Sequence, residues 1–438
     1  MKKSKTLLTI CLIIILAMVL ISCSGQNEET DTTMEFKTEE LSDDEKLCVE
    51  CHATETVGIV ASWDSSTHAD SAVSCLDCHF VEDDSPLALK NVEGHEDLSV
   101  SISMLVPPSI CAECHEDQVA QFYASGHYRA ALQVEDKESM QTLMFIHEGQ
   151  ELEGLDGASA ETGCNQCHGS RFELDENGIP TGSTYPSSGI GNIYPDGDVG
   201  NCSVCHTRHN FDIAEARRPE ACASCHIGPD HPDLEIYEAS KHGQLYASEG
   251  EEWIWDRPTG EWEPGDYTAP TCATCHMSGI GELDTTHNVT ERLYWNAWAK
   301  VSKVREEDDV MATYYGDGEA GRELMTQVCT ECHTEPLISG FFESADNAVK
   351  LYNEAYFAPA EAMRVELAEL GLLKDNPWKD EFQVIYYYLW HHEGRRARQG
   401  SLMGGADWAH WHGFFELMQD IYKLEDIYEQ RIETGVIE

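Results

Sequence analysis

The chain has 438 residues, with 80 acidic and 28 basic side chains and a net charge of −52 at pH 7. Such a negative field makes nucleic acid and anionic lipid surfaces poor partners, and it favours cationic partners or mineral surfaces. A solvated acidic surface with no dedicated partner explains the same composition more simply. Much of the remaining information lies in the spacing of the 18 cysteines.

The N-terminus has the features of an export signal. Three lysines within the first five residues precede an apolar run over residues 7–21. The stretch from Leu20 to Cys23 then resembles a bacterial lipobox, which predicts a lipoprotein signal peptide over residues 1–22 and a lipid on Cys23. A retained anchor is the alternative, although the run is shorter than the ~20 residues of a spanning helix. Both interpretations place the protein outside the cytoplasm, anchored to a membrane at its periplasmic face or at the cell surface. Residues 23–45 are polar and acidic, so we expect a disordered tether there.

Eight C-x-x-C-H motifs follow, and this spacing is the signature of covalently attached c-type haem. Two thiols three positions apart reach the two vinyl groups of one porphyrin, and the adjacent histidine falls under the iron. A lone motif is also compatible with a redox pair or half a zinc site, but eight motifs that all end in histidine are not. The predicted attachment cysteines are Cys48, Cys51, Cys75, Cys78, Cys111, Cys114, Cys164, Cys167, Cys202, Cys205, Cys222, Cys225, Cys272, Cys275, Cys329 and Cys332. The predicted proximal ligands are His52, His79, His115, His168, His206, His226, His276 and His333.

Eight covalently bound haem c groups in so short a chain form most of the core. We therefore expect a mainly α multihaem cytochrome with little sheet, in which residues 46–340 form an octahaem domain of short helices and loops. The motifs are unevenly spaced, which excludes a solenoid of equal repeats.

Residues 341–438 predict a region of long helices. Helical spacing of apolar residues runs through residues 344–373, and Asn376-Pro377 has the pattern of a helix start. Asp407 is the expected cap of the last helix. That helix carries one apolar stripe, which forms either intramolecular core or a subunit interface: Trp411, Phe415, Met418, Tyr422 and Ile427.

Twelve of the 20 histidines lie outside the motifs, and low-spin haems need a second axial ligand. Several local contexts resemble the octahaem hydroxylamine oxidoreductase (HAO) family. The matching stretches are Gly163–Ser170, Cys205–His209, Cys225–Pro232, Ser240–Gly243, Thr286–Asn288, His391–Arg398 and Trp411–Gly413.

The resemblance implies that seven haems have two histidine ligands and that the haem at His168 keeps an open face for catalysis. Asp230 and His231 would face that open position. The resemblance also implies a homotrimer. The distal ligands it implies are His68, His95, His127, His209, His242, His287 and one of His391 and His392. His147, His410 and His412 are left for helix packing or hydrogen bonds to haem propionates.

The residues themselves support a role for Asp230 and His231. They lie four and five positions after the proximal ligand His226, close to a porphyrin, and an imidazole paired with a carboxylate suits proton delivery to a nitrogen oxide. An exposed Gly-Pro-Asp-His-Pro turn without chemistry is the alternative.

Oxidative members of the family attach a tyrosine to the catalytic porphyrin, whereas this chain has Trp408 at the corresponding place. The resemblance is therefore to the reductive branch: reduction of a small nitrogen oxide, nitrite or hydroxylamine, with electrons from a partner cytochrome or a membrane quinol-oxidising protein. An electron conduit to minerals or filaments is the second hypothesis. Hydroxylamine or hydrazine oxidation is the third.

Overall fold

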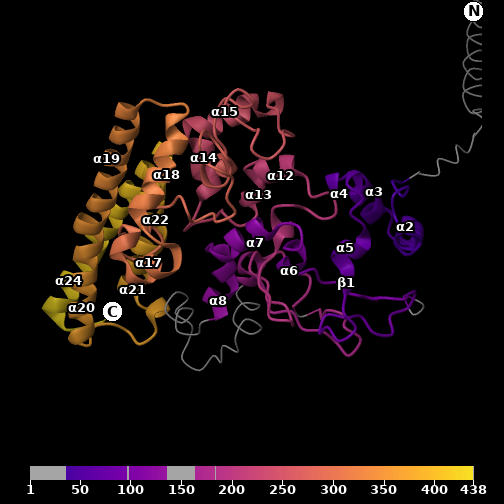
Figure 1. The fold of residues 1–438 in the computed structure, drawn as a ribbon. Coiled ribbons are helices and arrows are strands. Elements are labelled where there is room, and N and C mark those ends of the chain that lie inside the picture. The colour runs from indigo at the N-terminus through magenta and orange to yellow at the C-terminus, as the bar shows by residue number, and fades with distance from the viewer. Residues whose placement is uncertain (1–35, 96–97, 136–162, 183, 438) are drawn as a thin grey trace, which may run out of the picture.

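The computed structural model describes residues 36–95, 98–135, 163–182 and 184–437. The predicted signal peptide, Cys23 and His147 lie outside the described residues. The N-terminal segments occupy one end of an elongated molecule, and the last helices form a bundle at the other end (Figure 1). No helix of the described ranges is both long enough and apolar enough to cross a membrane.

The first part of the chain consists of short helices joined by loops, and its one sheet in the described residues has two strands. The α-helices are α2 (Asp43–Glu55), α3 (Val57–Asp64), α4 (Thr67–Asp70), α5 (Cys75–His79), α6 (Pro108–Cys111), α7 (Glu116–Tyr123), α8 (Ala130–Glu135), α11 (Asn165–His168), α12 (Ile213–Arg217), α13 (Glu220–Ala223), α14 (Asp233–Ala239), α15 (Lys241–Glu249), α16 (Cys272–His276) and α17 (Asp309–Tyr315). Strand β1 (Phe80–Val81) pairs antiparallel with β2 (Ser101–Ile102). The 3₁₀ turns are η1 (His127–Arg129), η3 (Cys202–Val204), η4 (Gly250–Glu252), η5 (Arg305–Glu307) and η7 (Pro377–Lys379). The expected mainly α fold with little sheet is confirmed.

Several motifs lie on helical turns that a polar residue caps. In α5 the amide of Ser74 donates to Asp77 at 2.6 Å, and in α16 the amide of Thr271 donates to the Thr274 hydroxyl at 3.0 Å. These caps satisfy backbone donors that a short helix leaves unpaired. They also hold the two thiols and the histidine of each motif on a single turn.

The packed part of the chain begins earlier than the predicted boundary at residue 46. Ser42 caps α2, with its amide donating to Glu45 at 2.7 Å, and Leu41 is buried in a cluster with Val49 and Trp63. The expected tether over residues 23–45 is therefore wrong for residues 36–45. Phe36 packs against the same cluster, so two apolar side chains in a polar stretch anchor this segment.

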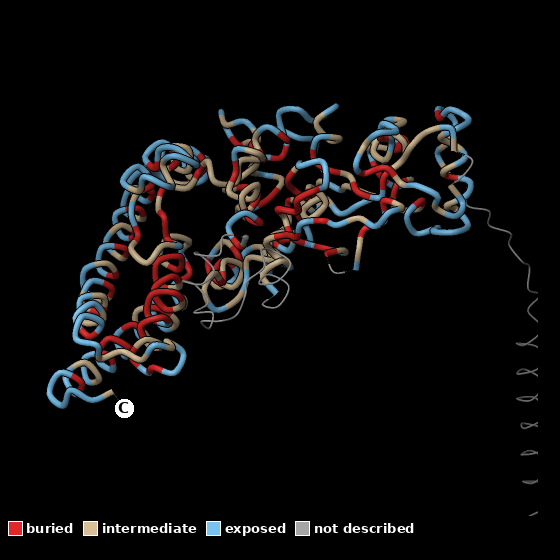
Figure 2. Tube along the Cα trace, turned by 90° about the horizontal axis from the view of Figure 1, so that it is seen from below, coloured by how far each residue is buried: buried red, intermediate tan, exposed pale blue. Residues whose placement is uncertain are grey.

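The C-terminal region has the predicted long helices, although they begin before residue 341. Its elements are α18 (Gly318–Thr330), α19 (Glu335–Leu351), η6 (Tyr352–Phe357), α20 (Ala358–Glu369), α21 (Glu381–Tyr388), η8 (Leu389–Glu393), α22 (Gly394–Leu402), α23 (Ala406–Ala409), η9 (His410–Phe414) and α24 (Phe415–Thr434). Three of them, η6, η8 and η9, are π-helical segments within longer helical runs. Buried residues concentrate on the inner side of this bundle (Figure 2).

The two predicted caps have different outcomes. Asn376 accepts a hydrogen bond from the Trp378 amide at 3.0 Å and caps η7, whereas Asp380 caps the helix α21 that follows. Asp407 does not act as a cap, because the helical run that leads into α24 begins with α23, where Gly405 is the N-cap and Asp407 lies in the first turn. The carboxylate of Asp407 instead lies 3.4 Å from His412 Nε2.

The predicted apolar stripe of α24 does not form intramolecular core over most of its length. Trp411, Phe415, Met418 and Tyr422 are exposed, and only Ile427 packs against the core cluster. The buried face of α24 carries Leu417, Ile421 and Leu424 instead. A subunit interface stays a prediction for the exposed stripe.

A buried ion pair joins α24 to the start of α21. Asp380 and Arg431 are 0% and 3% exposed, with Arg431 Nη2 3.1 Å from Asp380 Oδ1. Burial raises the pKa of Asp380, but hydrogen bonds from Arg431 and two backbone amides outweigh burial, so the pKa lies below its ordinary value. The carboxylate therefore stabilises the bundle as an anion.

We expect Arg431→Met to lower the free energy of unfolding by about 3–5 kcal/mol, because it leaves a buried charge unpaired. Urea unfolding of the haem-loaded protein, followed by circular dichroism, measures this loss. Lys350→Met is the control, with an effect below about 1 kcal/mol, because it removes an exposed cation whose partner Glu354 is also exposed. Because the pKa of Asp380 is depressed in the folded state, its contribution is present above the unfolded pKa of about 3.9 and is lost as pH falls through the folded value. Equal effects of the two substitutions contradict this account.

Candidate haem sites and catalytic pocket

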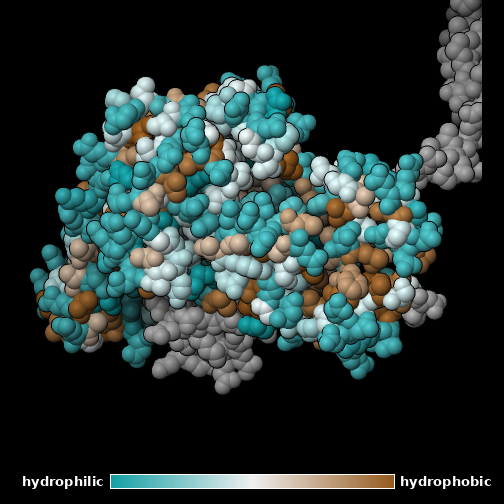
Figure 3. Space-filling model, in the orientation of Figure 1, coloured by the Kyte–Doolittle hydropathy of each residue, from teal (hydrophilic) through white to brown (hydrophobic). Residues whose placement is uncertain are grey.

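One continuous cavity of about 2470 Å³ runs through the molecule, and residues of all eight motifs contribute to its lining. A pocket for one small ligand or cofactor measures about 300–1,000 Å³, so this cavity suits several porphyrins in contact. Leu47, Ile59 and Met104 line it although they are exposed, as expected of side chains that cover haem edges. Apolar side chains gather on this N-terminal half of the surface (Figure 3).

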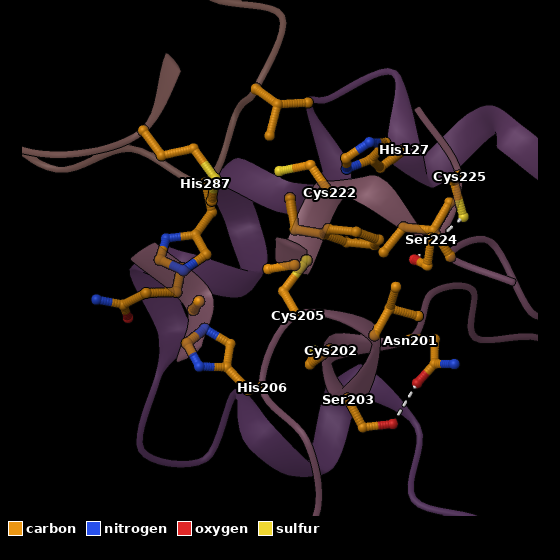
Figure 4. A pocket seen from close by; sticks show the side chains of 18 of the residues that line it. His127, Asn201, Cys202, Ser203, Cys205, His206, Cys222, Ser224, Cys225 and His287 are labelled. Carbon is orange, nitrogen blue, oxygen red and sulfur yellow. Dashed lines mark hydrogen bonds between the residues drawn. The ribbon is translucent and has the colours of Figure 1, made fainter. Parts of the chain in front are cut away.

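Six proximal histidines face a second histidine across the cavity. An iron that binds two imidazole nitrogens at about 2.0 Å each places the ring centroids slightly more than 6 Å apart. The observed centroid distances are 6.0 Å for His52–His95, 6.3 Å for His79–His209, 6.2 Å for His115–His68, 6.4 Å for His206–His287, 6.2 Å for His226–His127 and 6.0 Å for His333–His242. Figure 4 shows His206 and His287, with Cys202 and Cys205 of the His206 motif nearby. The residues present therefore fit haem with two histidine ligands at these six positions.

The second ring nitrogen of several proximal ligands is held by a neighbour. Nδ1 of His79 bonds the Ser103 carbonyl at 2.7 Å, and Nδ1 of His226 bonds Asp233 Oδ2 at 2.8 Å. Such bonds fix the tautomer and aim Nε2 at a metal. Because its partner is a carboxylate, the imidazole of His226 is a more electron-rich ligand than that of His79, whose partner is a carbonyl.

The predicted seventh pair is not formed. No second histidine ring of the described residues lies opposite His276 or His168. His391 lies beside Asp230, with Nε2 3.8 Å from Oδ2, and His392 packs on Tyr388 at a ring distance of 4.9 Å. A ligand role for His391 or His392 stays a prediction that this geometry does not support.

The motifs follow one another as neighbours through the cavity. Burial and the neighbouring thiol of Cys48 raise the pKa of Cys75 to about 11. Burial and the neighbouring thiol of Cys111 raise the pKa of Cys78 to about 11. Hydrogen bonds between thiols join Cys111 to Cys202 and Cys222 to Cys272, and electrostatic interactions link Cys205 to Cys222 and Cys275 to Cys329. Cys167 of the fourth motif contacts Cys225 of the sixth. The order is thus one, two, three, five, six, seven and eight, with the fourth motif as a branch at the sixth.

The backbone around His168 is closely packed. Its Nδ1 bonds the Ala130 carbonyl at 2.9 Å, and the next residue, Gly169, has φ 107°. A Cβ on Gly169 would lie 2.6 Å from backbone atoms of Gly191 and Asn192, so only glycine fits there. Burial lowers the pKa of His168, with the Ala130 carbonyl opposing that effect. These contacts hold the ring in one orientation, aimed into the cavity.

Asp230 and His231 share the cavity wall with His168, and both act on it electrostatically. They lie in the loop before α14 and are 20% and 27% exposed, so the alternative of a fully exposed turn is wrong. His231 Nε2 is 3.6 Å from Asp230 Oδ1, and Arg395 Nη1 is 3.0 Å from Asp230 Oδ2. The imidazole of His231 also lies 5.3 Å from the Trp298 ring.

Sequence reasoning gave no role to Arg395 of α22. It occurs in the stretch His391–Arg398 that carries the family resemblance, but nothing in the sequence connects it with Asp230, 165 residues away. Burial lowers the pKa of Arg395, and Asp230 opposes that effect. Trp408, in contrast, is not among the lining residues and packs against His412 at a ring distance of 4.6 Å.

Comparisons with known proteins agree with this geometry. Residues 196–376 match the family described as seven times multi-haem cytochrome CxxCH, and residues 20–80 and 110–207 match cytochrome c554 and c-prime. The chain is 28% identical over 331 residues to a probable nitrite reductase-hydroxylamine oxidoreductase fusion protein of Kuenenia stuttgartiensis. This match covers 68% of the chain but only 35% of that relative.

Two solved structures have a similar fold. A hypothetical multiheme protein matches 91% of the chain and 97% of its own length, with a TM-score of 0.76 at 23% identity. The reducing HAO-like protein complex of Kuenenia stuttgartiensis matches 89% of the chain and 86% of its own, with a TM-score of 0.62 at 21% identity. The chain therefore has the fold of these multihaem proteins and resembles HAO-like multihaem c-type cytochromes in sequence, and its C-x-x-C-H motifs bind haem c covalently.

Proposed function

We propose that the protein carries eight haems and reduces nitrite, hydroxylamine or both at the haem of His168, while the other haems pass electrons. The observation that carries this proposal is the Asp230–His231 pair in the wall of the cavity that His168 faces. The haem supplies an iron that binds the substrate nitrogen and delivers electrons to it. Asp230, His231 and Arg395 supply the polar groups around that nitrogen.

Proton delivery is the task we assign to His231. Nitrite reduction to ammonium takes up six electrons and eight protons and releases two waters, and hydroxylamine reduction takes up two electrons and three protons and releases one water. His231 Nε2, 3.6 Å from Asp230 Oδ1, passes protons one at a time and is recharged through the carboxylate. Arg395 fixes that carboxylate at 3.0 Å, so His231 keeps one orientation.

Electrons reach the pocket through the series of neighbouring motifs, and the fourth motif branches from the sixth. Cysteines of the first, third and eighth motifs are exposed, which gives a partner access to those haems. We propose a redox partner cytochrome or a membrane quinol-oxidising protein as donor. We further propose a homotrimer outside the cytoplasm, with a lipid anchor at Cys23. The unbroken series also favours the second hypothesis, an electron conduit.

The direction of the reaction follows from position 408. An indole there lacks the phenol of the oxidative members, and Trp408 lies outside the cavity lining of its own chain. A haem held by His168 would lack the tyrosine link of the oxidative members, and distortion of the macrocycle is one way in which proteins tune haem chemistry. We therefore favour reduction over oxidation of hydroxylamine or hydrazine.

We expect His231→Ala to lower nitrite turnover about 10²–10⁴-fold, because it removes a positioned proton donor. Steady-state assays with a reduced donor measure turnover, and optical spectra check that the haems stay loaded and reducible. His410→Ala is the matched control, since His410 is exposed and outside the cavity lining. Turnover of His231→Ala within threefold of the parent protein would show that protons come from elsewhere.

Reaction direction is tested in one anaerobic preparation supplied in turn with nitrite and a reduced donor, and with hydroxylamine and an oxidised acceptor. We expect reduction to be at least tenfold faster, and digestion to yield no haem peptide linked to tyrosine or tryptophan. Faster hydroxylamine oxidation contradicts the proposed direction. No turnover with either substrate, together with eight low-spin haems, favours the conduit.

A further inference from the structure

A buried cation, Arg395, lines the cavity beside Asp230 in a very acidic protein. The Arg395 side chain is 8% exposed, lines the cavity and belongs to a chain with a net charge of −52. That surrounding field repels anions over a long range. A fixed positive charge beside Asp230 offsets that repulsion for an anionic substrate at this point of the wall.

Contacts on every side hold Arg395 in place. Its Nε donates to the Trp298 carbonyl at 3.0 Å, and its Nη1 donates to Asp230 Oδ2 at 3.0 Å. Its guanidinium carbon lies 5.5 Å from the ring of Trp298 and 5.4 Å from the ring of Trp390. These aromatic faces stabilise the cation and shield it from water.

Arg395 retains donors for a ligand. A guanidinium has five N–H groups, and two of them are used in these bonds. The two N–H groups of Nη2 bond no group of the described residues. His391 Nε2 and His231 Nε2 lie 3.8 Å and 3.6 Å from the same Asp230 carboxylate. The guanidinium of Arg395 and the imidazoles of His231 and His391 therefore surround the carboxylate of Asp230.

Resting on the proposed function, we infer that Arg395 binds the oxygen atoms of an anionic substrate and makes nitrite, not hydroxylamine, the preferred ligand of this pocket. Nitrite is a planar anion with two oxygen acceptors, which a guanidinium recognises through paired hydrogen bonds. Hydroxylamine is uncharged near neutral pH and gains little from a cation. Asp230 orients Arg395 and lowers the net charge of the pocket, so it limits how tightly nitrite binds.

The test compares Arg395→Gln, Arg395→Lys, Asp230→Asn and Arg396→Gln in the haem-loaded full chain. Arg396 is the matched control, because it lies on the same helix but pairs with Glu393 and Glu416 outside the cavity lining. Optical titration of the oxidised protein gives the Kd for nitrite without turnover. Steady-state assays with a reduced donor give the KM for hydroxylamine.

We expect Arg395→Gln to raise the nitrite Kd about 10- to 100-fold, since a hydrogen bond to a charged group is lost. The hydroxylamine KM should change less than threefold. Arg395→Lys should lose less nitrite affinity than Arg395→Gln, Asp230→Asn should bind nitrite at least as tightly as the parent protein, and Arg396→Gln should match the parent within twofold.

Two results overturn the inference but not the proposed function. The first is a nitrite Kd that does not change in Arg395→Gln. The second is an equal rise of the nitrite Kd in Arg395→Gln and Asp230→Asn, because both substitutions would then act only through the structure of the pocket. A parent protein that binds no nitrite and reduces neither substrate overturns the proposed function, and the inference with it. The two failures are thus distinguishable.

Discussion

The structure depends on pairs of imidazole rings that face one another across a shared cavity. Each pair joins segments far apart in the chain, such as His79 with His209 and His206 with His287, at centroid distances of 6.3 and 6.4 Å. A metal site that exists only in the folded chain couples its binding free energy to folding. Haem attachment therefore closes the loops of the N-terminal part, where the apolar clusters are small and separate from one another.

The helical bundle has a different kind of core and a different task. Its core is a cluster of apolar side chains that do not line the cavity, among them Tyr352, Phe382, Leu389, Leu417 and Leu424. Helix α22 connects the bundle to the pocket through hydrogen bonds. Arg398 donates to the Ala299 carbonyl, and Arg395 donates to the Trp298 carbonyl and to Asp230. Bundle and haem region meet at the wall where we place substrate binding.

Much of this arrangement could be predicted from local sequence. The motifs gave the proximal ligands, and the resemblance gave six distal histidines that the structure brings opposite them. Features set by tertiary packing could not be predicted. Burial of Leu41 orders the end of the expected tether, Gly405 rather than Asp407 caps the helical run that leads into α24, and the stripe from Trp411 to Tyr422 faces solvent. The positions of Arg395 and His391 beside Asp230 depend on how α22 and η8 dock, which no spacing in the sequence encodes.

Counting axial ligands in the oxidised, haem-loaded protein tests the central claim most directly. Near-infrared magnetic circular dichroism distinguishes haems with two histidine ligands from the others, and intact mass gives the number of haems attached. The account predicts eight haems, at least six of them with two histidines, and a high-spin haem that responds to nitrite. Fewer than six such haems would contradict it, because the facing rings would then not be ligand pairs.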